Sequence, residues 1–96
     1  MNKYEIMFIV KATNEADTIA NVAKEMQKLI SDNKGKVVEF KELGEKKLAY
    51  PIKKEISGYY YVMQVEGSHD TVAEFDRKAL LNENVLRHLT IRIDEE

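Results

Sequence analysis

The chain has 96 residues, of which 44% are hydrophobic and 33% are charged, and it contains no cysteine. This length fits a single domain covering residues 1–96, because chains divide into several domains only beyond about 250 residues. The missing cysteines exclude disulfide scaffolds and thiolate metal sites. Fifteen basic residues against seventeen carboxylates give a net charge of −2, so a nucleic-acid role would need local basic patches or a basic partner.

The amino-terminal third predicts a strand followed by a helix. Residues 3–10 place an apolar side chain at every second position, which is typical of a β-strand. Thr13 or Asn14 is the expected helix cap, and apolar residues then recur at three- and four-residue spacing over residues 19–30. We expect Gly35 to adopt the left-handed conformation that commonly ends a helix.

The middle of the chain predicts two more extended stretches. Residues 36–43 and 46–52 both show strand patterns, and Gly44 between them is expected to form a bulge. Ser57-Gly58 is typical of a turn, and residues 59–65 then form a third strand rich in aromatic and β-branched residues.

The last third predicts a second helix and a fourth strand. Gly67-Ser68 opens the helix, and Asn82 and Asn84 end it. Residues 85–93 alternate as a strand, and the acidic tail of residues 94–96 is expected to fray. The apolar stripe expected on this helix consists of Val72, Phe75, Ala79 and Leu80.

The order of these elements, β-α-β-β-α-β, predicts an α+β fold of the ferredoxin-like, split β-α-β kind. With right-handed crossovers, the strands form an antiparallel sheet in the order 4-1-3-2, and two helices pack on one face. The other face stays open, and that face or an edge is where such small domains meet partners. The longest uncharged apolar stretch, residues 6–10, is far below the ~20 residues that span a bilayer, and we expect no secretory signal.

Signals for catalysis, metals and cofactors are weak. His69 and His88 lack metal-ligand spacing from each other and from any pair of carboxylates. The four glycines stand singly at element ends, so they form no phosphate-binding loop. Spacing suggests no nucleophile with a base. We therefore expect a protein without catalytic activity, metal or cofactor.

The tyrosines of the third strand are candidates for a binding surface. Tyr59 and Tyr61 share one face of that strand, and Tyr60 lies on the other with Val62. One face must pack under the helices, and the pattern leaves open which. The exposed tyrosines could stack on bases or lie in a protein interface. An RNA recognition motif has the same order of elements, but its aromatic signature is missing around residues 59–65.

Basic residues gather in three places: Lys46-Lys47, Lys53-Lys54, and Arg87 with Arg92. Between the first two pairs lies Leu48-Ala49-Tyr50-Pro51-Ile52, which sets apolar and aromatic groups among cations in an extended arm. Lysines attract phosphates, and the aromatic and proline groups offer a rigid docking surface. The alternative interpretation of this segment is a solvent-exposed hairpin that binds no partner.

These residues carry a resemblance to a known family. The run from Gly44 to Lys53, together with Gly58-Tyr59 and Gln64-Val65-Glu66, resembles the signature of bacterial small-subunit ribosomal protein six. Tyr4-Glu5 ahead of an apolar strand and Asn84-Val85-Leu86-Arg87 at the last strand fit the same family. The resemblance extends over the whole chain in length, element order and loop placement.

The resemblance implies a structural component of the 30S ribosomal subunit in the bacterial cytoplasm. It implies binding to the central domain of 16S ribosomal RNA as a heterodimer with small-subunit ribosomal protein eighteen, without a membrane or a small-molecule substrate. A basic partner of this kind would supply positive potential that the chain itself lacks. Lys46 and Lys47 stand where arginines are common in the family, which keeps the charge but loses the bidentate grip on phosphate.

Two sets of site residues are expected on these grounds. The expected RNA contacts are Lys3, Tyr4, Lys46, Lys47, Arg87 and Arg92. The expected contacts with the protein partner are Tyr50, Pro51, Ile52, Lys53, Tyr59 and Tyr61. The main alternative is a small-molecule-sensing domain of the same fold that dimerises through its sheet. A third possibility is an enzyme of the dimeric α+β barrel kind, with a polar cavity formed from His88, Glu5 and the tyrosines.

Overall fold

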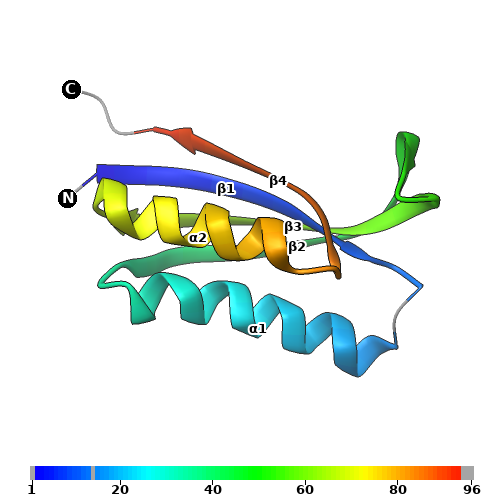
Figure 1. Cartoon of the computed structure of the whole chain (residues 1–96), viewed down its shortest axis with the longest axis horizontal. Helices are drawn as coiled ribbons and strands as arrows, with labels where there is room; N and C mark the ends of the chain where they lie inside the picture. Colours follow the sequence, from blue (N-terminus) through cyan, green and yellow to red (C-terminus); the bar gives the residue numbers. More distant parts are fainter. Residues whose placement is uncertain (1, 14, 94–96) are drawn as a thin grey trace.

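The computed structural model describes residues 2–13 and 15–93, and within them it contains a four-stranded antiparallel sheet and two helices. The strand order β2-β3-β1-β4 and the β-α-β-β-α-β connectivity confirm the predicted ferredoxin-like fold. Figure 1 shows both helices on the same side of the sheet. The elements are β1 (Asn2–Lys11), α1 (Ala16–Asp32), β2 (Lys36–Ile52), β3 (Glu55–Gly67), α2 (His69–Leu81) and β4 (Val85–Arg92).

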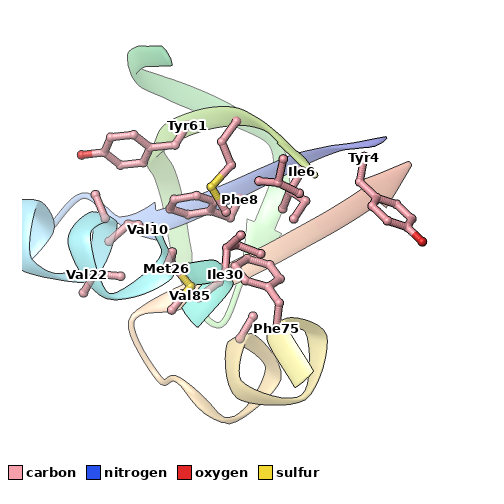
Figure 2. Packing of buried hydrophobic residues seen from close by; sticks show 14 of the residues in the cluster. Tyr4, Ile6, Phe8, Val10, Val22, Met26, Ile30, Tyr61, Phe75 and Val85 are labelled. Atoms are coloured by element: carbon pink, nitrogen blue, oxygen red, sulfur yellow. The ribbon is translucent and has the colours of Figure 1, made fainter. Parts of the chain in front are cut away.

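The hydrophobic core lies between the sheet and the helices (Figure 2). The alternation in β1 directs Ile6 and Phe8 to this side, where both are fully buried. Phe8 stacks on Tyr61 of β3 with 5.2 Å between ring centroids, and Phe75 of α2 is equally buried. Burial of such side chains stabilises the fold by roughly 1.5–3 kcal/mol each. Of the helices within the described residues, none is long and apolar enough to cross a membrane.

The apolar stripe of α1 is confirmed, whereas its two ends differ from the prediction. Glu15 is the capping residue, and the Thr13 hydroxyl instead donates to Glu55 Oε1 at 3.2 Å. Asn14, the other predicted cap, and the acidic tail of residues 94–96 lie outside the described residues.

At the carboxyl end of α1, Lys34 with φ 69° is the left-handed residue, not Gly35. Gly35 is instead required for space, since a Cβ there would lie 2.8 Å from both Ile30 and Thr71. Its amide donates to the Ile30 carbonyl at 2.8 Å and so helps to end the helix.

Helix α2 begins directly after Ser68, as the Gly67-Ser68 signal indicated, and a capping box forms its start. The Ser68 hydroxyl accepts from the Thr71 amide, and the Thr71 hydroxyl accepts in return from the Ser68 amide. The predicted stripe is correct for its first three members and wrong for Leu80, which is 76% exposed. An α-helix turns about 100° per residue, so Leu80 is rotated away from the buried Ala79 and off the sheet.

The connection between β2 and β3 also differs from the prediction. Ser57 and Gly58 lie inside β3, and the chain reverses at Lys53-Lys54, which Ile52 and Glu55 flank as the closing pair. Both lysines have positive φ, 51° and 69°, which is the pattern of a type I′ hairpin turn. Gly58 is needed because β1 approaches closely: a Cβ there would lie 2.2 Å from Ile9 Cγ2.

Candidate functional site

The open face of the sheet carries Tyr60, while Tyr59 and Tyr61 face the helices. Register decides this, because Tyr61 pairs with Phe8 and Tyr60 pairs with Ile9. Tyr61 is 1% exposed, so its ring belongs to the core. The expectation that Tyr61 contacts a protein partner is therefore wrong. Tyr59 is half-buried against the same core. Burial, with a smaller effect from the Glu42 carboxylate, raises the pKa of Tyr61 to about 12.

Tyr4 is also a core residue and not a stacking platform. Its ring is 7% exposed, and its hydroxyl accepts a hydrogen bond from the Asn2 side-chain amide at 3.3 Å. A base cannot stack on a ring that the fold already covers. Tyr4 is expected among the RNA contacts as a stacking or positioning group; its burial excludes stacking, and in this structure its ring packs in the core.

The hairpin formed by the end of β2 and the start of β3, residues 44–58, is an arm that folds back over the open face. Pairing is regular up to Lys47–Ser57 and resumes only at Ile52–Glu55, so residues 48–51 form an irregular bulge. Pro51 lacks the N–H that a regular ladder would need. The bulge turns Leu48 inward, where it is 7% exposed against Ile9 and Leu86. This small apolar cluster anchors the arm to the sheet.

The arm presents several exposed cations beside aromatic rings. The Lys46 ammonium lies 5.8 Å from the centroid of the Tyr60 ring, a cation–π arrangement. Lys47, Lys53 and Lys54 are exposed along the same arm. Glu45 accepts a hydrogen bond from the Ser57 hydroxyl at 3.0 Å, which joins the two strands of the arm.

Arg87 of β4 connects the arm to the opposite edge of the sheet. Its Nη1 donates to the Tyr50 hydroxyl, and its guanidinium carbon lies 5.8 Å from the centroid of the Tyr50 ring. Tyr50 is 55% exposed, so the pair stands at the surface. Two residues predicted for different partners, Arg87 for RNA and Tyr50 for protein, are thus brought into contact.

Lys3 and Arg92 lie apart from this group. Arg92 is opposite Tyr4, near the start of β1, whereas Arg87 is opposite Ile9. Five residues of strand separate these positions, about 17 Å at roughly 3.4 Å per residue. Figure 1 shows the arm at the end of the molecule away from the two termini. The predicted RNA-binding residues therefore fall into two sites, with Lys46, Lys47 and Arg87 in one and Lys3 and Arg92 in the other.

A hollow of about 390 Å³ lies on the open face between the arm and strands β1 and β4. Exposed apolar side chains continue from it along β4, where Leu89 is 51% and Ile91 47% exposed. Sequence reasoning missed this hollow, because it depends on the inward turn of Leu48. Its lining consists of Met7, Ile9, Leu48, Ala49, Tyr50, Ile52, Tyr60, Arg87, His88 and Leu89.

Fold and surface together define a ferredoxin-like domain whose distinctive feature is a basic, aromatic arm over an open sheet face. The model of the family described as ribosomal protein S6 matches residues 3–92. The chain is 37% identical over 95 residues to the small ribosomal subunit protein bS6 of Syntrophobacter fumaroxidans. It therefore belongs to the ribosomal protein S6 family, structural proteins of the small ribosomal subunit.

Solved structures agree with this assignment. The crystal structure of 30S ribosomal protein S6 from Thermotoga maritima superimposes with a TM-score of 0.90 at 27% identity, over 95% of this chain and 86% of that one. An uncharacterised protein from the same organism, 16% identical with a TM-score of 0.61 over 97% of this chain and 98% of that one, shares the fold alone. The match to the Syntrophobacter protein covers 99% of this chain but 65% of that relative's length.

Proposed function

We propose that this chain binds the central domain of 16S ribosomal RNA in the cytoplasmic 30S subunit, together with small-subunit ribosomal protein eighteen. The observation that carries the proposal is the arm, where exposed cations lie beside aromatic rings and Tyr50 contacts Arg87 across the open face. The family assignment supports a place in the small subunit, since ribosomal proteins of the subunit work among RNA and other proteins.

The RNA side of the proposal rests on the exposed cations of the arm. Lys46 and Lys47 lie near its base, and Lys53 and Lys54 lie at its tip. Each lysine that neutralises a phosphate releases a counterion, so binding weakens as salt rises. Arg87 is held by Tyr50, which fixes the direction of its guanidinium before RNA arrives. Lys3 and Arg92 form a second, separate contact near the start of β1.

The protein side rests on the hollow of the open face. Its apolar lining and the exposed Leu89 and Ile91 favour a hydrophobic segment of a partner. Tyr50 and Ile52 line it from the arm, and we propose these two residues, with the adjoining Pro51 and Lys53, as the contacts with the protein partner. The net charge of −2 suits a basic partner, which would supply positive potential for the RNA in the joint complex.

The proposal is tested by titrating the chain, with and without protein eighteen, against a 16S central-domain fragment. The variant Lys46→Gln/Lys47→Gln should bind less tightly, and its dependence of log affinity on log salt should fall by about two units. The control Lys24→Gln/Lys28→Gln removes two exposed lysines from α1, on the far side of the sheet, and should leave both quantities unchanged. Equal salt dependence of the arm variant and the unmodified chain would overturn the arm as the RNA site.

A further inference from the structure

A second hollow, of about 230 Å³, lies where the end of α2 meets the start of β4 and the tip of the arm. Its floor is apolar: Ala79, Val85 and Leu86 are 1%, 3% and 7% exposed. Leu80 lines it as well, although this leucine is 76% exposed. A large apolar side chain left this open beside a hollow offers a flat contact surface to a ligand.

The rest of the lining consists of basic side chains. Lys53, Arg87 and His88 contribute to it, and none of the lining residues within the described part of the chain is acidic. Two residues of α2 fix the position of His88: its Nε2 lies 3.4 Å from Asp76 Oδ1, and its ring packs edge-on against Phe75. Arg87 lines both this hollow and the larger one on the open face. The site is therefore built from the consecutive elements α2 and β4 together with the tip of the arm, which is distant in the sequence.

The carboxyl end of α2 borders the hollow and determines whether a charged or a neutral group fits inside. The carboxyl end of a helix carries about half a negative charge and unpaired carbonyl groups, so it disfavours an anion in the hollow. Lys53 and Arg87 nevertheless attract phosphates to the rim. A neutral group that is attached to phosphates satisfies both conditions, and its amino groups would suit the helix carbonyls. A nucleobase in single-stranded RNA is such a group.

The volume supports the same occupant. Pockets for whole small-molecule ligands measure about 300–1000 Å³, and this hollow is smaller. It has room for a single flat ring system but not for a complete cofactor. We propose that the hollow lined by Leu80, Val85, Leu86 and Arg87 receives one unpaired nucleobase of the bound RNA, with the adjoining phosphates on Lys53 and Arg87. This inference rests on the proposed RNA-binding function.

Two neighbouring leucines provide a matched test in the 16S fragment titration. Leu80→Ala removes one wall of the hollow. Leu81 is 67% exposed and lines only a separate hollow between α1 and α2, so Leu81→Ala is the matched control. Leu80→Ala should weaken binding about five-fold or more with an unchanged salt dependence, because apolar contact with a base releases no counterion. Leu81→Ala should bind as the unmodified chain does. Equal affinities of the two variants would overturn the base site.

A second measurement keeps the test independent of the ribosomal assignment. The four ribonucleoside 5′-monophosphates, with ribose 5-phosphate as the control, are added to the isotope-labelled full chain, and backbone amide shifts are recorded. At least one nucleotide should shift Leu80 and Leu86, while ribose 5-phosphate should leave them in place. Equal shifts from ribose 5-phosphate, or none from any nucleotide, would overturn the inference. Failure of the unmodified chain to bind the 16S fragment would instead refute the proposed function.

Discussion

The turn at the tip of the arm is strained, and relieving the strain should stabilise the protein. Lys53 and Lys54 both have positive φ, a region that costs a residue with a Cβ about 1 kcal/mol or more. Asparagine tolerates this region and glycine enters it freely, so Lys53→Asn/Lys54→Gly should recover about 2 kcal/mol. The extra freedom of glycine in the unfolded chain offsets about 0.5–1 kcal/mol of that gain.

The expected net effect is an increase of about 1 kcal/mol in the free energy of unfolding. For a domain of this size, that corresponds to a melting temperature about 4–8 °C higher. The gain should appear in global unfolding because the arm is not a free tip: Leu48 packs between Ile9 and Leu86. Urea denaturation at equal m-value measures it directly.

The control is Lys53→Gln/Lys54→Gln, which removes the same two charges but keeps a Cβ at both strained positions. It should change the free energy of unfolding by less than about 0.5 kcal/mol. If the two double variants are equally stable, charge and not backbone strain governs the turn. If the Asn-Gly variant is no more stable than the unmodified chain, the strain argument is refuted.

Three further outcomes concern stability. Phe75→Ala removes a fully buried ring and should lower the free energy of unfolding by about 3–5 kcal/mol in urea. Ser68→Ala should cost about 1 kcal/mol in the same assay, since the Thr71 amide loses its acceptor, and a smaller loss than in an exposed serine control would contradict the cap. Folding raises the pKa of Tyr61 to about 12, so the neutral phenol contributes to the free energy of unfolding. This contribution should be complete below pH about 10, where the tyrosine of the unfolded chain is also protonated. It should be lost as the pH rises towards 12. Tyr61→Phe should flatten that alkaline loss, and an unchanged pH profile would contradict the assignment.

Hydrophobic periodicity was sufficient to predict the fold. The two-residue alternation of β1 and the helical spacing in α1 identify elements whose order allows few topologies. Local turn chemistry was less reliable. Ser57-Gly58 has a turn composition, yet the small residue at position 58 is required by the close approach of Ile9. Tertiary contact, which a single sequence does not display, decided where the chain reverses.

The site was only partly predictable for a similar reason. The cations of the arm follow from composition, but the burial of Tyr61 depends on its pairing with Phe8. Both faces of β3 carry tyrosine, so alternation alone could not say which faces the helices. The contact between Arg87 and Tyr50 joins residues 37 positions apart, and it arises because the bulge at Leu48 folds the arm over the sheet.

We propose that this chain binds 16S ribosomal RNA jointly with a basic protein partner. The most direct test is a titration of the unmodified chain against a central-domain fragment at two salt concentrations, with and without small-subunit ribosomal protein eighteen. We expect weak binding by the chain alone and tight, salt-dependent binding in the presence of the partner. Absence of binding under both conditions would contradict it and favour a domain of this fold that senses a small molecule and dimerises through its sheet.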